Sequence, residues 1–120
     1  MITIRNKDEM QKYYIEEVDM YAFNDDVEFL FDVETDSSIS AVNINANDIV
    51  ANNIYAWNIK AHNINDANIS AYNIDADDIS YYAICYAYNS IKCNSIKGTR
   101  ENSKHFVLDG ELIIKGEENK

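Results

Sequence analysis

A few reactive residue types in this chain could carry covalent chemistry. Cys85 lies within the segment 81–86, which also holds three tyrosines, and His62 could serve as a base for such a nucleophile. No serine or cysteine, however, has a histidine and an orienting acid at the spacing of a catalytic motif. The chain also lacks a glycine-rich phosphate loop and a paired-carboxylate motif. We therefore expect a protein that is not an enzyme.

Metal and cofactor chemistry is not expected either. The two cysteines and the distant His62 and His105 match no zinc-ligand spacing, so we predict no metal site and no cofactor. No apolar run is long enough to span a membrane, and residues 1–9 lack an apolar signal core. We expect a cytoplasmic protein in which Cys85 and Cys93 remain free thiols.

The charge is strongly negative and uneven along the chain. The net charge is −11, and residues 1–38 hold eleven acids and three bases, a net −8. Residues 39–88 have a net charge of −4, and residues 89–120 a net +1. Without a basic stripe, we expect no direct binding of nucleic acid and no attraction to an anionic membrane.

A sequence repeat fills the middle of the chain, and the fold of this repeat must position the reactive and charged side chains described above. Isoleucine occurs at every fifth position over ten repeats: Ile39, Ile44, Ile49, Ile54, Ile59, Ile64, Ile69, Ile74, Ile79 and Ile84. Asn usually precedes each Ile, and Ala usually follows two residues later. A five-residue step gives no apolar stripe on a helix and alternates faces on a flat strand. The repeat therefore predicts a β-solenoid in which Ile and Ala point inward and x-Asn forms each corner, because Asn tolerates the left-handed region.

This run of Ile-x-Ala-x-Asn units resembles the pentapeptide-repeat family, over about fifty of the 120 residues. Members of that family fold as a right-handed four-sided β-helix, which the resemblance implies here. The family order is small-Asn/Asp-large-x-x, whereas this chain places Asn outside the inward pair. With the tail Ser103-Lys104-His105-Phe106-Val107-Leu108-Asp109-Gly110, the chain also resembles small phage proteins. That resemblance implies the host bacterial cytoplasm as its location.

Three parts are expected: an N-terminal α/β cap at 1–38, the solenoid at 39–97, and a C-terminal hairpin cap and tail at 98–120. The cap is predicted as a β-α-β unit, because a strand at 1–5 precedes a capping-box-like Asn6 and Glu9. Met10, Tyr14, Val18 and Tyr21 follow with helical spacing, and residues 27–34 alternate as a strand does. Residues 106–114 around Asp109-Gly110 predict a β-hairpin, and 116–120 a frayed end.

Three positions depart from the regular repeat or test it. Ile91 follows Ile84 by seven residues, which predicts a bulge or a change of corner within 85–90. Asp66 stands in an Ala slot; it is either inward and hydrogen-bonded or displaced by a local slip of register. We favour the slip, because an unpaired inward carboxylate costs several kcal/mol. Cys93 falls in the small inward slot and is predicted to pack in the core.

The outward positions supply the candidate binding residues. If four pentads form one coil, as the family resemblance implies, residue i stacks on i+20. One face then combines Tyr55 and Trp57 with Asp75, Asp77 and Asp78, and another stacks Val42, His62 and Tyr82. Trp and Tyr beside charges make good partner anchors, although a solvated face is the simpler interpretation. The remaining candidates are the acids of the cap: Asp25, Asp26, Glu28, Asp32, Glu34 and Asp36.

The function we expect is non-enzymatic: an acidic binding protein that occupies a nucleic-acid-binding surface of a basic host protein by charge mimicry. Long-range attraction favours such an encounter. Relatives within the pentapeptide-repeat family mimic DNA, so the resemblance implies a phage-encoded inhibitor, for example an anti-CRISPR. The alternatives are a structural or self-assembling module, with a homodimer formed through a solenoid end, and a gyrase-protecting protein.

Overall fold

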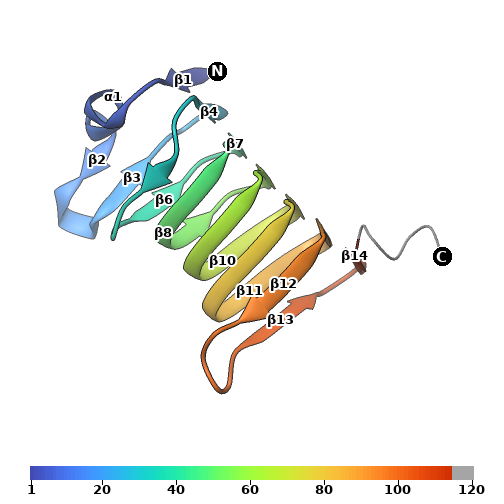
Figure 1. Ribbon diagram of the computed structural model, residues 1–120. Helices are drawn as coiled ribbons and strands as arrows, with labels where there is room; N and C mark the ends of the chain where they lie inside the picture. The colour runs from blue at the N-terminus through green and yellow to red at the C-terminus, as the bar shows by residue number, and fades with distance from the viewer. Residues whose placement is uncertain (115–120) are drawn as a thin grey trace.

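The chain folds into a stack of β-strand coils, seen from the side in Figure 1, the computed structural model. The structure describes residues 1–114, so the tail predicted at 116–120 lies outside the described residues. Within the described part, the strands pair in parallel except for β2 with β3. The prediction of a mainly β solenoid with a short helix near its N-terminus is confirmed.

Most elements are short strands, and the longer ones run around corners of the coil. The N-terminal elements are β1 (Ile2–Ile4), α1 (Lys7–Gln11), β2 (Tyr14–Ile15), a 3₁₀ turn (Glu16–Val18), β3 (Met20–Ala22), β4 (Val27–Phe29) and β5 (Val33–Glu34). The elements of the repeat are β6 (Ser38–Ser40), β7 (Asn43–Asn45), β8 (Asp48–Tyr55), β9 (Asn58–Lys60), β10 (Asn63–Asp75), β11 (Asp78–Cys93) and β12 (Ser95–Gly98). The last two strands are β13 (Lys104–Val107) and β14 (Glu111–Ile114).

Three columns of stacked side chains define three sides of the coil. Side 1 stacks Tyr21, Ile39, Ile54, Ile69 and Cys85. Side 2 stacks Ile2, Val27, Ile44, Ile59, Ile74, Ile91 and Leu112. Side 3 stacks Val33, Ile49, Ile64, Ile79 and Ile96. The isoleucines from Ile39 to Ile79 are all buried, so they form the core that the repeat predicted.

One coil contains three pentads. Ile49 pairs with Ile64 and Ile64 with Ile79, a step of fifteen residues. The prediction of a four-sided coil, with residue i on i+20, is therefore wrong. The pentad sets the length of one side, because Ile and Ala point inward, the residues flanking Ile point outward in the strand, and the residue before Asn lies at the corner. It contains no information on how many sides close a coil, and that number came from the family resemblance.

The corners are held by backbone hydrogen bonds between coils. The carbonyl of Val42 accepts from the N–H groups of Trp57, at 2.8 Å, and Asn58, at 3.3 Å. The carbonyl of Asn47 accepts from His62 and Asn63 in the same way, at 2.8 and 3.1 Å. Because one carbonyl satisfies two N–H groups, the chain turns without glycine or proline at these corners.

Asparagine forms ladders along the stack. The Nδ2 of Asn73 donates to Oδ1 of Asn58, the Nδ2 of Asn58 to Oδ1 of Asn43, and the Nδ2 of Asn43 to Oδ1 of Asp26, each at 2.7 Å. An amide suits a ladder because it donates and accepts at once. Our expectation that Asn would adopt the left-handed conformation is wrong, since Asp19 is the only described non-glycine residue with positive φ.

The coil formed by β11 is two residues longer than the fifteen-residue coils that precede it. Residues 66–68 of β10 lie opposite residues 81–84 of β11, and residues 71–73 lie opposite residues 87–90. β11 therefore has one extra residue at each of these two places. The seven-residue gap predicted one irregularity, and the structure contains two bulges, one on each side of Cys85. As a result Cys85 is fully buried on side 1, whereas Ile84 is turned outward and is 47% exposed.

Asp66 points into the core, so the predicted slip does not displace it. It lies in the Ala slot of side 3, between Ala51 and Tyr81, and only 3% of its surface is exposed. Its Oδ1 accepts a hydrogen bond from the backbone N–H of Ala51 at 2.7 Å, and Oδ2 has no partner. Cys93 is buried in the small slot of side 2, as predicted.

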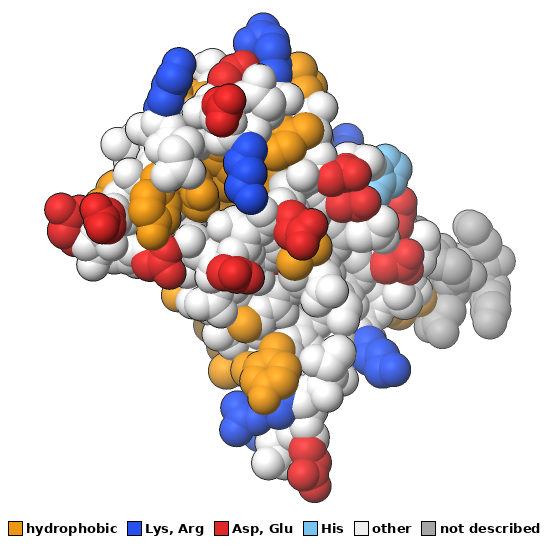
Figure 2. Space-filling view, turned by 60° about the vertical axis from the view of Figure 1, so that its left-hand side comes forward, with side chains coloured by type: hydrophobic (Ala, Val, Ile, Leu, Met, Phe, Trp, Pro, Cys, Tyr) orange, Lys and Arg blue, Asp and Glu red, His pale blue; other side chains and the backbone are white. Residues whose placement is uncertain are grey.

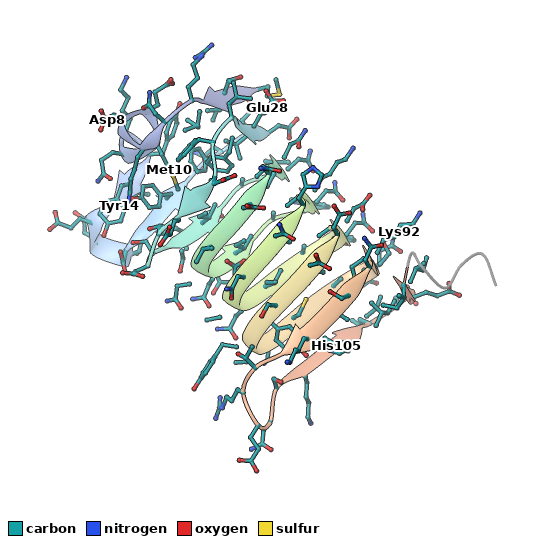
Figure 3. All side chains as sticks on the ribbon, in the orientation of Figure 1. Asp8, Met10, Tyr14, Glu28, Lys92 and His105 are labelled. Carbon is teal, nitrogen blue, oxygen red and sulfur yellow. The ribbon has the colours of Figure 1, made fainter. Side chains whose placement is uncertain are left out.

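The parallel stack extends past residue 39 toward the N-terminus. β3, β4 and β5 already form the three sides of a first coil, on sides 1, 2 and 3. The strand predicted across 27–34 is accordingly divided at a corner, where Leu30 is exposed. β1 covers side 2, and Figure 3 shows Met10 directed from α1 toward the strands, where it is buried.

The N-terminal helix is shorter than its apolar spacing suggested. Asn6 caps it as predicted, with Oδ1 accepting from the N–H of Glu9 at 2.9 Å, but the helix ends at Gln11. Tyr14 instead pairs with Tyr21 across β2 and β3, their ring centroids 5.0 Å apart. The antiparallel connection thus buries Tyr21, whereas Val18 of the predicted helix face is 59% exposed.

The two C-terminal strands do not form the predicted hairpin. β13 pairs in parallel with β11 on side 1, and β14 pairs in parallel with β11 on side 2. Asp109-Gly110 forms the corner between them, where a Cβ added to Gly110 would lie 1.7 Å from the carbonyl oxygen of Asn89. The Asp-Gly signal therefore marks a close approach between coils, and the segment continues the stack.

Candidate binding surfaces

Two surfaces of different character run along the stack. Side 1 and its borders are aromatic and carry no charge across residues 38–88, and the edge between sides 2 and 3 is acidic. In a three-sided coil, side 1 lies opposite that edge. Figure 2 shows one view of the surface, in which acidic side chains are distributed widely and hydrophobic side chains lie in separate groups.

The acidic edge contains six carboxylates: Glu28, Asp32, Asp48, Asp75, Asp77 and Asp78. Glu28 and Asp75 belong to one outward column of side 2, with Asn45 and Lys60 between them. Asp48 and Asp78 stack on side 3 through Asn63. Asp77 lies on the corner itself, where its Oδ2 is 2.7 Å from Nδ1 of His62. His62 is thus a member of this outward column, far from the buried Cys85.

The first coil places more acids at the N-terminal end of this edge. Oδ1 of Asp32 accepts from Nδ2 of Asn47 at 3.0 Å, which puts Asp32 in the corner column of His62 and Asp77. Glu34 precedes Val50 in the outward column of side 3, beside Thr35 and Ser37 and away from this edge. Five predicted site residues are therefore brought together here: Glu28, Asp32, Asp75, Asp77 and Asp78.

The other predicted residues lie elsewhere. Tyr55 is outward on side 1, and Trp57 is on the corner between sides 1 and 2, so the predicted grouping of these two with Asp75 does not form. Asp25 heads that corner column, and its carboxylate lies 3.1 Å from the N-terminal amine of Met1. Asp26 ends an asparagine ladder, and Asp36 is exposed just after β5.

The aromatic surface includes residues that the sequence reasoning did not group together. On the corner between sides 1 and 2, Trp57 stacks on Tyr72 with centroids 4.8 Å apart and planes at 3°, and Tyr72 contacts Tyr88 at 5.0 Å. On side 1, Tyr86 contacts Phe106 at 5.0 Å. The signal that could have found the stack is the fifteen-residue step from Trp57 to Tyr72. The expected stack of Val42, His62 and Tyr82 is absent, because these residues lie on three different corners.

Side 1 lacks charge across the repeat. The charged residues between 38 and 88 are Asp48, Lys60, Asp66, Asp75, Asp77 and Asp78. Each of them lies on side 2, on side 3, at the edge between them, or in the core. The outward positions of side 1 are taken by serine, asparagine, isoleucine and aromatic residues. A groove of about 300 Å³ lies over this surface, with Ser70 and Ala71 among its lining residues and Trp57, Tyr72 and Tyr86 around them.

Some titratable groups are shifted by their surroundings. A hydrogen bond from the N–H of Asp26, together with the N-terminal amine, lowers the pKa of Asp25. Hydrogen bonds from Ser37 and Tyr14 lower the pKa of Asp19. Burial raises the pKa of Asp66 to about 8, and burial with the nearby Cys93 and Asp66 raises the pKa of Cys85 to about 12. A thiol with so high a pKa holds almost no thiolate near neutral pH.

Comparison with known proteins identifies no family for this chain, so the chain is classified by its fold alone. No protein-family model, curated protein or solved structure matches this chain. The protein is a β-solenoid, and its three-sided coil differs from the four-sided coil that the pentapeptide-repeat resemblance implied. Residues 1–114 include no group of His, Cys, Asp or Glu arranged to hold a metal ion. In the same residues we find no helix with the length and apolar character needed to span a bilayer.

Proposed function

We propose that the protein is a non-enzymatic binding protein whose acidic edge occupies the nucleic-acid-binding surface of a basic host protein. In this role it would act by charge mimicry, as a phage-encoded inhibitor such as an anti-CRISPR does. The observation that carries the proposal is the gathering of six carboxylates along one edge of the stack. Acids fixed in this way attract a basic channel over a long range and lose little conformational freedom on binding.

The geometry supports mimicry of the overall field rather than of phosphate spacing. Coils follow one another at about 4.8 Å, whereas phosphates of one DNA strand are about 3.4 Å apart. Asp32 and Asp77 lie three coils apart in the corner column, with Asn47 and His62 between them. Because Asp32 accepts from Asn47 and Asp77 contacts His62, these two carboxylates are held in place.

The test is capture of proteins from bacterial lysate at low salt, using the wild-type chain and a variant with Asp75, Asp77 and Asp78 changed to Asn. We expect the wild type to retain a basic nucleic-acid-binding protein that elutes in high salt and is displaced by DNA. The triple variant removes three charges from exposed or half-exposed positions, so it should fold normally and capture at least about tenfold less.

A matched control removes the same charge from the other end of the molecule. Asp8→Asn with Glu16→Gln and Glu17→Gln changes three acids of the N-terminal cap and leaves the acidic edge intact. Equal capture by the wild type and the first variant, with loss in this control, would move the contact to the cap. Recovery of nothing except the chain itself would refute the proposal.

A further inference from the structure

All six exposed aromatic side chains of the described residues lie on side 1 and its two borders, and this concentration needs an explanation. They are Tyr55, Trp57, Tyr72, Tyr82, Tyr88 and Phe106, and Val42 and Ile84 are exposed beside them. Tyr55 is 44% exposed and Trp57 58%. Ile84 owes its exposure to the bulge in β11, which turns it out of the core. Across residues 38–88 this face carries no charge, which is unusual on a chain with a net charge of −11.

We propose that side 1 is the interface of an antiparallel homodimer, in which two copies pack their aromatic faces together. The area agrees with this assignment. An aromatic side chain has about 200 Å² to bury, so six of them at near-half exposure leave roughly 600 Å². The serines and asparagines between them bring the face close to the ~800 Å² that each partner contributes to a standard interface.

Electrostatic repulsion selects this face over the others. Two copies of a strongly acidic chain repel each other, and contact is least unfavourable where neither copy carries charge. Because side 1 lies opposite the acidic edge, pairing through side 1 puts the two acidic edges on the outer flanks of the dimer. The carboxylates of the two acidic edges are then as far apart as the molecule allows.

The uneven charge along the axis determines the antiparallel direction. Glu16, Glu17 and Asp19 are exposed at the N-terminal end of the border between sides 3 and 1, where the carbonyl of Asp19 accepts from the N–H of Ser38. Arg100 and Lys104 are exposed at its C-terminal end, with Glu101 between them, and the N–H of Arg100 donates to the carbonyl of Tyr82. Figure 3 shows this separation of the ends, with Asp8 and Tyr14 at one and His105 at the other. An antiparallel two-fold axis brings the acids of one copy to the bases of the other.

Serine provides a matched pair of substitutions. Ser70 and Ser80 both follow an inward isoleucine and are both half-buried, but Ser70 is outward on side 1 and Ser80 on side 3. Ser70 also lies near the middle of the side 1 stack, where a two-fold axis would pass. Ser70→Glu places two carboxylates face to face at the centre of the proposed interface, while Ser80→Glu adds the same charge away from it.

The experiment is sedimentation equilibrium over a wide dilution series, with circular dichroism to verify the fold. We expect wild type and Ser80→Glu to have twice the 13.8 kDa mass of the chain, and Ser70→Glu to have a dissociation constant at least about tenfold higher. The emission of Trp57, the only tryptophan, should shift to the red as the wild type is diluted and should already be shifted in Ser70→Glu. If Ser70→Glu fails to fold, Tyr55→Glu tests the same face.

The antiparallel direction of the dimer is tested by exchanging charges between its two ends. Glu16→Lys with Glu17→Lys, or Arg100→Glu with Lys104→Glu, should each weaken the antiparallel dimer, and all four in one chain should restore it. Strengthening by either pair alone would indicate a parallel dimer and contradict the proposed direction. A monomeric wild type, or dissociation by Ser80→Glu and not by Ser70→Glu, would overturn the interface. These measurements need no target protein, so their outcome is independent of the proposed function.

Discussion

The coils of residues 38–81 and the coil of β11 are built from the same repeat but differ in which isoleucine is buried. Ile69 has 1% of its surface exposed, and Ile84, fifteen residues later in the same series, has 47%. The single-residue bulge before Ile84 moves Cys85 into the column that Ile69 occupies. The comparison teaches that the register of the coil decides whether a side chain points inward. A position of the sequence repeat stays inward only where successive coils have the same length.

The largest expected effect concerns Asp66, at the last position before the register shifts. Burial raises its pKa in the folded chain to about 8, whereas an unfolded aspartate titrates near 4. Between these pH values the folded state holds a proton that the unfolded state has lost, so stability falls as pH rises. The total fall is on the order of 5 kcal/mol.

Asp66→Ala should remove this pH dependence, because Ala is the residue that the repeat places in the slot. Urea unfolding near pH 5 and near pH 8 should show the wild type approaching the variant at the lower pH and falling well below it at the higher pH. The difference between the two proteins isolates Asp66 from the other carboxylates. Parallel pH curves for wild type and variant would contradict the assignment of a raised pKa.

The next effect compares the two isoleucines directly. Ile69→Ala removes a fully buried side chain from side 1 and should lower the free energy of unfolding by about 3 kcal/mol. Ile84→Ala removes the same atoms from an exposed position and should lower it by less than about 0.5 kcal/mol. Both are measured by denaturant unfolding at one pH. Similar losses in the free energy of unfolding for the two variants would mean that β11 lacks the first bulge.

The smallest effect compares the asparagine ladder in the two regions. Asn58→Ala breaks two ladder bonds, to Asn43 and from Asn73, and should cost about 1 kcal/mol. In the irregular coil, Oδ1 of Asn73 accepts from both Asn89 and Ser90, at 2.9 Å each. Ser90→Ala leaves the bond from Asn89 intact, so it should cost about 0.5 kcal/mol or less. A larger loss for Ser90→Ala than for Asn58→Ala would show that the ladder is not the stabilising element.

The sequence was sufficient to predict the solenoid and the inward Ile and Ala of the regular coils, because their spacing follows from strand alternation within one side. It did not predict that Asp66 would point inward or that Ile84 would point outward. It was insufficient to predict the number of sides, since a five-residue unit fits any coil made of whole pentads. The gap between Ile84 and Ile91 indicated two extra residues, but their division around Cys85 depends on packing against β10. The hairpin signal at Asp109-Gly110 failed because a close backbone approach between coils also requires glycine.

The candidate surfaces were predicted in part. The clustering of Asp75, Asp77 and Asp78 needed only their nearness in sequence. Their proximity to Glu28 and Asp32 depends on the actual coil length. It could not be predicted while each coil was assumed to contain twenty residues. The same error separated Trp57 from Tyr72 in the prediction, although these two side chains stack face to face in the structure.

The asparagine ladders also give the stack a polarity. In each of these side-chain bonds the Nδ2 group donates toward the N-terminal neighbour, and the series end on Asp26, Asp32, Asp48 and Ser38, which accept. The amide dipoles therefore add along the axis, with their positive ends toward the acid-rich terminus and their negative ends toward the terminus that holds most of the bases, as peptide dipoles do in a helix. A residue that joins a ladder from the C-terminal side therefore has to donate, as Asn89 and Ser90 do to Oδ1 of Asn73 and as Ser95 does to Oδ1 of Asp78.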